Sequence, residues 1–219
     1  MTTEAEENYL KAIWKRSLNT TEAVSTNAIA AHLNTTAASV TDMLRKLAEK
    51  ELIVYEKYKG VHLAPEGRRI AVGLVRKHRL WECFLVERLG FGWDEVHDLA
   101  EVLEHLQSDK LTERLAAYLG NPRTDPHGDA IPDAHGNFEQ TNAVLLATLT
   151  VGECATIAGV DEHSSEFLQY LDKNNLNIGI KIKVETINVY DNSLIIKGKQ
   201  NKKISISSKV AQNLLVARL

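Results

Sequence analysis

The sequence predicts a mainly α-helical protein with a small β domain at its C-terminal end. Hydrophobic residues recur at helical spacing through most of the first 120 residues. From residue 143 onward they alternate with polar residues, as in KIKVETI, a pattern typical of strands. Residues 121–137 lie between these regions, hold three of the four prolines and predict a linker or an irregular loop. We therefore expect three domains, at residues 1–74, 75–140 and 141–219.

The first domain begins with three predicted helices. Residues 4–17 place apolar side chains at helical spacing, and residues 25–33 predict a short helix with Ser25 as its N-cap. After a tight polar turn, Thr35 or Thr36 can cap a third helix. The second and third helices therefore have the order of a helix-turn-helix.

Two short strands follow, at residues 52–56 and 61–63, before Pro65 begins another helix. Three helices followed by a two-stranded wing are the order of a winged helix-turn-helix. The second helix of the helix-turn-helix, which is the third helix here, enters the DNA major groove. Basic groups on that helix and on the wing contact phosphates. The candidate base contacts are Thr36, Ser39 and Asp42, and the candidate phosphate contacts are Arg45, Lys46, Lys57 and Lys59. The alternative is a small helical domain used for protein contacts.

The middle domain is predicted to be helical. Residues 66–89 predict one helix or a pair, residues 94–107 another, and residues 111–119 a third that ends at Gly120. The third has an apolar face that suits a partner such as a second subunit, made of Leu111, Leu115, Tyr118 and Leu119.

Helix 94–107 carries two histidines and two glutamates on one side. At 100° per residue they form a stripe about 100° wide, and they are His97, Glu101, Glu104 and His105. Apolar residues occupy much of the remaining circumference, so we expect this helix to be buried. Buried acidic and imidazole groups need a partner, and a divalent cation accepts both kinds of donor. The alternative is a solvated polar face with incidental histidines.

A second pair lies upstream, where RKHRLWE places His78 and Glu82 one helical turn apart. Together the six side chains predict a site for one or two metal ions. Residues 76–140 contain thirteen acidic and seven basic residues, which suits a region whose charge is partly balanced by bound cations. We expect His127 and His135, in the proline-rich loop, to be solvated turn residues.

The alternating segments of the last domain predict a small antiparallel barrel. Between its early strands, VDEHSSEFLQYL predicts a short helix with His163 and Glu166 three residues apart on one side. The lysine-rich segment KGKQNKK predicts an exposed hairpin turn, and the alternative is that it serves the barrel in peptide or protein binding.

Composition limits the class of protein. No run approaches 18 apolar residues and the N-terminal MTTEAEENYL is acidic and polar, so we expect a cytoplasmic protein without a signal peptide or membrane contact. Cys83 and Cys154 form neither a disulfide framework nor a C-x-x-C metal site, and we expect both in cores.

These motifs resemble the diphtheria toxin repressor family of metal-dependent transcriptional regulators, including its manganese transport regulator branch. The resemblance covers essentially the whole chain and is strongest in LVRKHRL, VHDLAEVLEH and PHGDAIP. IVYEKYKGVHLAPEGRRIA is similar to the family's wing and following helix. The resemblance implies a winged helix-turn-helix domain, a helical dimerisation and metal domain, and a Src-homology-3-like barrel related to the FeoA domain.

The resemblance also implies two metal sites. The ancillary site would contain His78, Glu82 and His97, completed by His163 and Glu166 from the barrel. The primary site would contain Glu101, Glu104 and His105, with Asn8 from the first helix. Because family members usually carry Met or Asp at that last position, weak ligation by Asn8, a water molecule or nearby Glu7 are open alternatives. Lys11 stands where the manganese branch can offer a glutamate.

Oxygen and imidazole donors favour Mn²⁺, with Fe²⁺ second, although Zn²⁺ or Co²⁺ are expected to bind more tightly in vitro. Iron-sensing relatives carry a cysteine at the position of Glu101. The resemblance implies a homodimeric repressor of metal-homeostasis genes that binds a pseudo-palindromic operator in double-stranded DNA. It implies neither an enzyme nor a small-molecule substrate. The alternative is a dinuclear metallohydrolase, because a site of paired His and carboxylate ligands with an open position can activate water.

Overall fold

The computed structural model describes residues 2–18, 22–56, 59–139 and 142–219. The chain forms two compact units, of which the first contains residues 1–78, 101–114 and 132–138 and the second the remaining residues. One helix, α4 (Pro65–Leu89), begins in the first unit and ends in the second. The expected domain boundaries at residues 74 and 140 stay a prediction.

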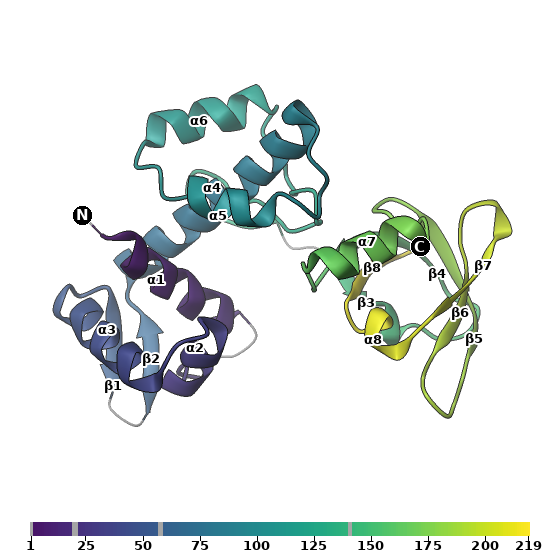
Figure 1. Cartoon of the computed structure of the whole chain (residues 1–219), viewed down its shortest axis with the longest axis horizontal. Helices are drawn as coiled ribbons and strands as arrows, with labels where there is room; N and C mark the ends of the chain where they lie inside the picture. The colour runs from purple at the N-terminus through teal and green to yellow at the C-terminus, as the bar shows by residue number, and fades with distance from the viewer. Residues whose placement is uncertain (1, 19–21, 57–58, 140–141) are drawn as a thin grey trace. The chain divides into compact units, whose positions relative to one another are not determined.

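The first unit contains the predicted winged helix-turn-helix (Figure 1). Its elements are α1 (Glu4–Ser17), α2 (Thr26–His32), α3 (Ala37–Glu49), β1 (Ile53–Glu56) and β2 (Gly60–Leu63). Ser25 and Thr36 cap α2 and α3 through their hydroxyl oxygens, as expected from residues that compete well for free backbone N–H groups. Strands β1 and β2 pair antiparallel, with Val54 opposite His62.

The core of the first unit forms where the helices and the wing meet. Leu10, Ile13 and Trp14 of α1 are completely or almost completely buried, and Trp14 stacks on Phe138 with ring centroids 5.4 Å apart. A Cβ atom at Gly67 would lie 1.9 Å from the carbonyl oxygen of Leu52, so this glycine lets α4 approach the wing.

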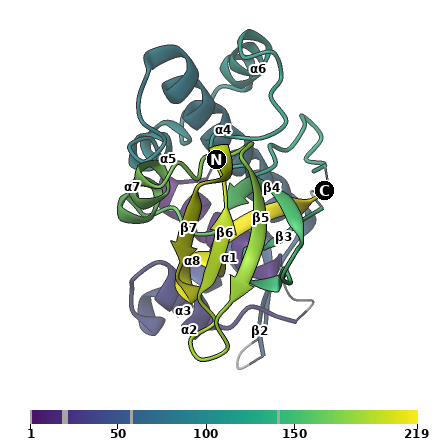
Figure 2. The same ribbon diagram turned by 90° about the vertical axis from the view of Figure 1, so that its right-hand side faces the viewer.

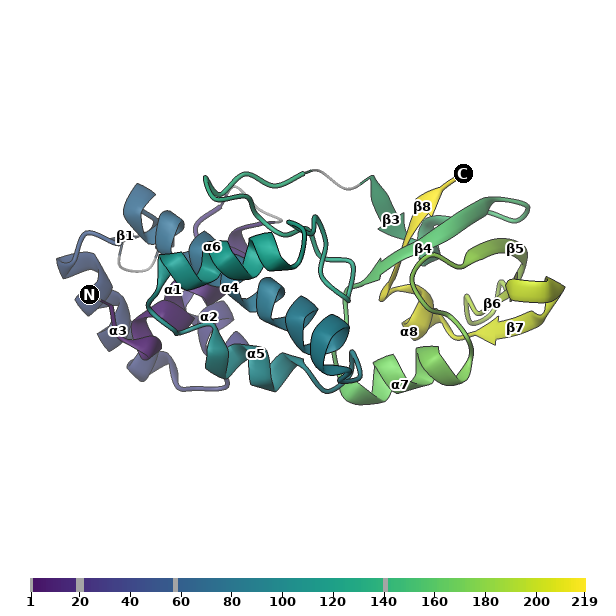
Figure 3. The same ribbon diagram turned by 90° about the horizontal axis from the view of Figure 1, so that it is seen from above.

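In the second unit, the C-terminal half of α4 packs against the end of α6 (Asp109–Tyr118), and Figure 3 shows the two helices running side by side. Leu80, Cys83, Leu115 and Leu119 lie in their common core. Residues 66–89 thus form one continuous helix and not a pair.

Helix α5 (His97–Leu103) is shorter than predicted from the periodicity of residues 94–107. The expectation that it is buried was wrong, because Ala100 is its one buried residue and Val102 is 75% exposed. Glu104 and His105 lie in a turn, and the amide of Leu106 donates to the carbonyl of Leu103. Glu104 is completely buried and contacts Lys11 and His78. These contacts favour the turn at Glu104 over the continued helix that the periodicity predicts.

The C-terminal part of the second unit is a six-stranded antiparallel sheet of order β3-β8-β4-β5-β6-β7 (Figure 2). Its strands are β3 (Ala143–Leu145), β4 (Cys154–Val160), β5 (Lys181–Ile187), β6 (Leu194–Lys197), β7 (Lys203–Ile206) and β8 (Leu214–Arg218). Helices α7 (Ser165–Lys173) and α8 (Ser208–Ala211), with the 3₁₀ turns Leu146–Thr148 and Lys199–Asn201, complete it. Ile182 and Val184 of β5 point into its core while Lys181 and Lys183 are exposed, which confirms the predicted alternation.

Several smaller expectations have mixed outcomes. Cys83 is buried, and burial raises the pKa of its thiol, but Cys154 is exposed and the prediction of a core position for it was wrong. His163 precedes α7 and does not lie on it. Among the described residues there is no helix with the length and apolar character needed to cross a membrane.

Candidate metal centres

Acidic, basic and imidazole side chains, most of them buried, gather at two places in the described part of the chain. We define the first centre as Glu7, Lys11, His78, Glu101, Glu104 and His105, all in the first unit. We define the second centre as Glu82, His97, Asp125, His127 and His163, all in the second unit. Because buried ionic groups cost free energy unless they are paired, each cluster needs a compensating partner.

Glu104 lies in the middle of the first centre. Its side chain is fully buried and accepts hydrogen bonds from the Lys11 ammonium at 2.8 and 2.6 Å. Nδ1 of His78 lies 2.6 Å from Glu104 Oε2. Burial alone would raise the pKa of Glu104, but the hydrogen bond from His78 and the charge of Lys11 hold it below its usual value. Glu104 is therefore a carboxylate held between two donors.

Helix α1 supplies a second carboxylate to the first centre. Oε2 of Glu7 lies 2.7 Å from Nδ1 of His105, and Oε1 of Glu7 accepts from the Gln107 amide at 2.7 Å. Nε2 of His105 is 3.8 Å from Glu104 Oε1, which links the two carboxylates. The side chain of Asn8 is exposed, so the residue of α1 that the structure directs to His105 is Glu7.

Glu101 lies at the edge of the first centre. Its Oε1 atom is 3.7 Å from the Lys11 ammonium, and its side chain is 54% exposed. The four residues of the predicted stripe thus separate, because Glu101, Glu104 and His105 belong to the first unit and His97 to the second.

In the second centre, Glu82 of α4 lies between two histidines. Its carboxylate oxygens are 3.3 Å from Nδ1 of His97 and 3.5 Å from Nδ1 of His127. Nε2 of His127 must donate to the carbonyl oxygen of Trp93, at 2.8 Å, because a carbonyl can only accept. This bond directs Nδ1 of His127 toward Glu82, and such orientation by a backbone carbonyl is typical of metal-binding histidines.

Asp125 is held in the loop beside His127. Its Oδ1 atom accepts from the backbone amides of His127 and Asp129, at 2.8 and 2.9 Å. Arg79 fixes the same loop, with its guanidinium 3.1 Å from Asp129 and bonded to the carbonyl of Ala130. Ligand atoms of Glu82, Asp125 and His127 all lie within 4.8 Å of one another.

The protonation of the second centre reflects two buried acids in close contact. Burial and the charges of Asp129 and Glu82 raise the pKa of Asp125. Burial alone would lower the pKa of His127, but the hydrogen bond and charge of Glu82 raise it to about 9. Without an added cation, a proton on His127 balances the negative charge of Glu82.

His163 faces the second centre from the segment before α7, with its ring centroid 4.8 Å from that of His127. Burial lowers the pKa of His163 to about 4, so the ring is neutral at pH 7. Its Nε2 atom is buried and has no hydrogen-bond partner in the described part of the chain. The nearest carboxylate oxygen, Oδ2 of Asp129, lies 4.0 Å away, beyond hydrogen-bond distance. A neutral imidazole nitrogen that makes no hydrogen bond is what a divalent metal ion requires.

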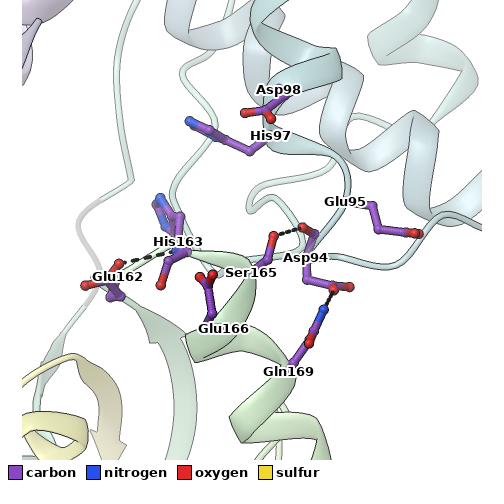
Figure 4. A pocket seen from close by; sticks show the side chains of 10 residues that line it. Asp94, Glu95, His97, Asp98, Glu162, His163, Ser165, Glu166 and Gln169 are labelled. Atoms are coloured by element: carbon purple, nitrogen blue, oxygen red, sulfur yellow. Dashed lines mark hydrogen bonds between the residues drawn. The ribbon is translucent and has the colours of Figure 1, made fainter. Parts of the chain in front are cut away.

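A pocket of about 630 Å³ opens beside His97 and His163. Figure 4 shows both rings at its wall, with Glu166 and Gln169 of α7 below them. Gln169 donates to Asp94 at 2.8 Å, and the Ser165 hydroxyl donates to the Asp94 carbonyl. Glu166 is exposed and lines this pocket, so it lies at the rim of the second centre.

Both centres offer the donor types that a divalent metal ion requires. Of the two, as far as the described residues show, only the second brings ligand atoms of three of its own residues within 4.8 Å of one another. Carboxylate oxygen and imidazole nitrogen suit Mn²⁺ and Fe²⁺, and neither centre contains a thiolate. Two observations support the fit at the second centre, namely this closeness of three ligand atoms and the buried Nε2 of His163, which has no hydrogen-bond partner among the described residues. At the first centre, the Lys11 ammonium already neutralises Glu104.

The candidate DNA contacts lie on the outside of α3 and the wing. Five of them are exposed along α3 or at its start: Thr36, Ser39, Asp42, Arg45 and Lys46. Thr36 also caps the helix by accepting from the Ser39 amide, and Arg45 lies 3.4 Å from Asp42. Lys59 is exposed in the wing beside Glu56, and Lys57 lies outside the described residues.

Sequence reasoning missed two members of the second centre. His127 is 1% exposed, so the prediction of a solvated turn residue was wrong, whereas His135 is exposed as predicted. The sequence analysis makes no prediction for Asp125. The available signal was the segment DPHGD, which places a carboxylate and an imidazole two residues apart in a loop with a tight glycine turn.

Three family models together match most of the chain. The N-terminal DNA-binding domain of iron-dependent repressors matches residues 1–61, and their metal-binding and dimerisation domain matches residues 64–133. The FeoA domain matches residues 144–218.

Individual relatives agree with these models. The chain is 34% identical over 104 residues to a diphtheria toxin repressor of Corynebacterium jeikeium, which is 48% of this chain and 43% of that protein. It is 30% identical over 148 residues to the iron-dependent repressor IdeR of Mycobacterium tuberculosis, 64% of each chain. The alignments thus span about half to two thirds of these curated relatives.

Solved structures match over the whole length. A manganese-dependent transcriptional repressor in complex with manganese is 35% identical and covers 98% of this chain and 100% of its own, with a TM-score of 0.90. The manganese regulator SloR is 31% identical with a TM-score of 0.77, over 100% of both chains. These relatives are repressors and not hydrolases, which confirms that the chain is not an enzyme. The chain therefore belongs to the iron-dependent repressor family of metal-dependent transcriptional regulators, also called the diphtheria toxin repressor family.

Proposed function

We propose that this protein is a homodimeric repressor that binds double-stranded operator DNA when Mn²⁺, or secondarily Fe²⁺, occupies the first centre. One observation carries the proposal. The first centre joins Glu7 of α1, within the DNA-binding domain, to Glu104 and His105 of the metal-binding and dimerisation domain. Occupancy of this one cluster therefore acts on the connection between the two domains.

The residues that would hold the ion in the first centre are Glu7, Glu101, Glu104 and His105, with His78 and Asn8 as further candidates. When bound, the ion supplies two positive charges that neutralise these carboxylates. Glu7 and Glu104 then keep α1 in a fixed relation to residues 101–105. Fixing this relation limits the arrangements available to α3 in a dimer and so favours the spacing of one DNA turn, about 34 Å, between two recognition helices.

The second centre would hold an ion that modulates the response. Its ligands would come from Glu82, His97, Asp125, His127 and His163, with Glu166 at the rim. We place His78 with the first centre because Nδ1 contacts Glu104. His163 belongs to the FeoA domain and Glu82 to the metal-binding and dimerisation domain. An ion in the second centre would therefore be bound by residues of both domains.

Manganese is the preferred candidate because the donors are oxygen and imidazole nitrogen in both centres. Four of the similar structures are manganese-dependent, manganese-activated or manganese regulators, which supports the same choice. Fe²⁺ is second, and Zn²⁺ or Co²⁺ would bind more tightly in vitro by the Irving–Williams order. The expected targets are genes of metal-ion homeostasis.

The test is a titration of chelator-stripped protein with Mn²⁺ and Fe²⁺ under anaerobic conditions, with binding to its own upstream DNA followed by fluorescence anisotropy. We expect metal to tighten DNA binding by about 5- to 150-fold, the usual range of coupling between two sites. Glu104→Ala removes this dependence, whereas Glu87→Ala, an exposed carboxylate of α4, keeps it. DNA binding that is equally tight with and without metal in the wild-type protein contradicts the proposal.

A further inference from the structure

The Lys11 side chain lies inside the first centre and not on the surface of α1. Only 7% of this side chain is exposed. Its ammonium contacts both oxygens of Glu104, at 2.8 and 2.6 Å, and lies 3.5 Å from His78 Nδ1 and 3.7 Å from Glu101 Oε1. Lysine is almost never buried this completely unless it is paired. Lys11 therefore supplies positive charge to the first centre when no metal ion is bound.

The ammonium contacts the atoms that a metal ion in this centre would need. Glu104 offers two oxygens, and Lys11 contacts both of them. A divalent ion bound to either oxygen would lie next to the ammonium in a buried place, where two positive charges repel strongly. Metal and ammonium therefore exclude each other at Glu104.

Lys11 has the means to leave the centre without unfolding α1. Its charge sits at the end of a flexible four-carbon stem, unlike a rigid guanidinium. Glu101 is the partner at the solvent edge of the centre, since its side chain is 54% exposed. The ammonium can remain near that carboxylate while Glu104 changes partner.

We propose that Lys11 is a tethered internal cation that competes with the metal ion for Glu104 and thereby raises the metal concentration needed to fill the first centre. The inference rests on the proposed function in one respect, namely that the first centre is the metal site. Lys11 then has two effects of opposite sign. It stabilises the metal-free protein by pairing with Glu104, and it weakens metal binding.

The experiment compares Lys11→Met, which keeps the length and removes the charge, with Lys11→Arg, which keeps the charge. Both are made in a His127→Ala background, so that the second centre contributes little to the titration. Mn²⁺ affinity is measured by competition with a metal-binding fluorophore at constant pH and without DNA. We expect Lys11→Met to bind Mn²⁺ about 10- to 100-fold more tightly, the range typical for groups adjoining metal ligands, and Lys11→Arg to bind no more tightly than the parent.

A second measurement separates competition from a purely structural role. In excess chelator, the melting temperature of Lys11→Met falls below that of the parent because the buried Glu104 loses its cation, and Mn²⁺ raises it more than in the parent. Lys11→Gln, which keeps a hydrogen-bond donor without a charge, replaces Lys11→Met if that variant does not fold. A structural role alone would lower the melting temperature and leave Mn²⁺ affinity unchanged or weaker, which overturns the inference.

The two proposals fail in different ways. Equal Mn²⁺ affinity in the parent, Lys11→Met and Lys11→Arg refutes the role of Lys11, even if metal still controls DNA binding. Tighter metal binding by Lys11→Met, with DNA binding independent of metal in every variant, supports the role of Lys11 and refutes the metal-activated repressor.

Discussion

His127 and His135 are eight residues apart in one proline-rich loop, yet their environments are opposite. His135 is exposed, whereas His127 is buried with its two nitrogens directed at Trp93 and Glu82. Local composition predicts the turn correctly in both places. It does not predict His127, because the partners of this ring come from α4 and from the segment before α5, far away in the sequence.

Replacing His127 tests its assignment to the second centre. We expect His127→Ala to lower metal affinity at this centre by about 10- to 100-fold, because Glu82 and Asp125 lose the imidazole nitrogen nearest to them. Isothermal titration with Mn²⁺ measures the change. His135→Ala is the matched control from the same loop and leaves affinity unchanged, and an equal loss in both variants would show that loop stability, not ligation, is responsible.

The exposed residues of α3 allow phosphate contacts to be separated from base contacts. We expect Arg45→Ala to weaken binding to all DNA sequences alike and to reduce the slope of log affinity against log salt by about 1. We expect Ser39→Ala to change the preference for particular bases and to leave the slope of log affinity against log salt unchanged. Anisotropy titrations over a salt series measure both. Arg69→Ala, an exposed arginine of α4, is the control. A slope change as large as that of Arg45→Ala would contradict the assignment.

Among the secondary-structure elements, the sequence predicts where α2 and α3 begin but not where α5 ends. Ser25 and Thr36 cap α2 and α3 because a hydroxyl oxygen next to an apolar periodic run satisfies free N–H groups. The end of α5 depends on Glu104, which leaves the helical stripe to pair with Lys11 and His78. Those partners come from α1 and α4, so periodicity within residues 94–107 contains no information about them.

The capping box of α1 gives a prediction for stability. The Thr3 hydroxyl accepts from the Glu6 amide, and the Glu6 carboxylate accepts from the Thr3 amide. We expect Thr3→Ala to lower the free energy of unfolding by about 1 kcal/mol. Urea unfolding monitored by circular dichroism measures it. Ser164→Ala is the control, because Ser164 holds the N-cap position of α7 without a side-chain cap bond, and a loss as large as that of Thr3→Ala would show that the cap is not the cause.

Glu6 makes part of this stability depend on pH. Burial alone would raise the pKa of Glu6, but hydrogen bonds from Lys50 and the Thr3 amide hold it below its ordinary value of 4.5. A carboxyl whose pKa is lower in the folded state stabilises the fold above pH 4.5, and this contribution is lost as the pH falls through the folded pKa.

The test compares the free energy of unfolding of the wild type with that of Glu6→Gln from about pH 3 to pH 7. We expect the wild type to be more stable by about 0.5–1 kcal/mol at neutral pH, with the difference shrinking below pH 4.5. A difference that stays constant across the range would mean that the charge of Glu6 contributes nothing.

At the scale of the whole molecule, the expected homodimer needs an apolar surface. Val102 of α5 is 75% exposed and Leu106 is 45% exposed, a pattern that suits burial against a second subunit. We expect Val102→Lys to convert the dimer to a monomer and to abolish tight operator binding, since two half-sites must be bound at once. Sedimentation velocity measures the mass. Val189→Lys, in the β5–β6 hairpin and 93% exposed, leaves the dimer intact, and a Val102→Lys protein that is still dimeric would place the interface elsewhere.

The general architecture was predictable because each part repeats a simple pattern. Periods of about 3.6 residues mark the helices, and strict alternation marks strands such as β5. Spacing also predicted that His78 and Glu82 lie one turn apart on α4. It did not predict that Glu104 and His105 leave the helix that carries His97 and Glu101. Lys11 as a partner of Glu104, and Asp125 and His127 as neighbours of Glu82, depend on packing between distant segments.

The loop that carries His127 is joined to the sheet by backbone as well as by side chains. The amide of Val160 donates to the carbonyl of His127, and a Cβ atom at Gly128 would lie 2.2 Å from the carbonyl oxygen of Ala158. The loop therefore packs directly on the backbone of strand β4. His163 lies shortly after the end of that strand. A shortened chain that ended before the sheet would lose the strand on which the His127 loop packs. It would retain Glu82, His97, Asp125 and His127 but lose His163 and the strand that supports their loop. If both proposed centres bind metal, we expect such a chain to respond through the first centre alone.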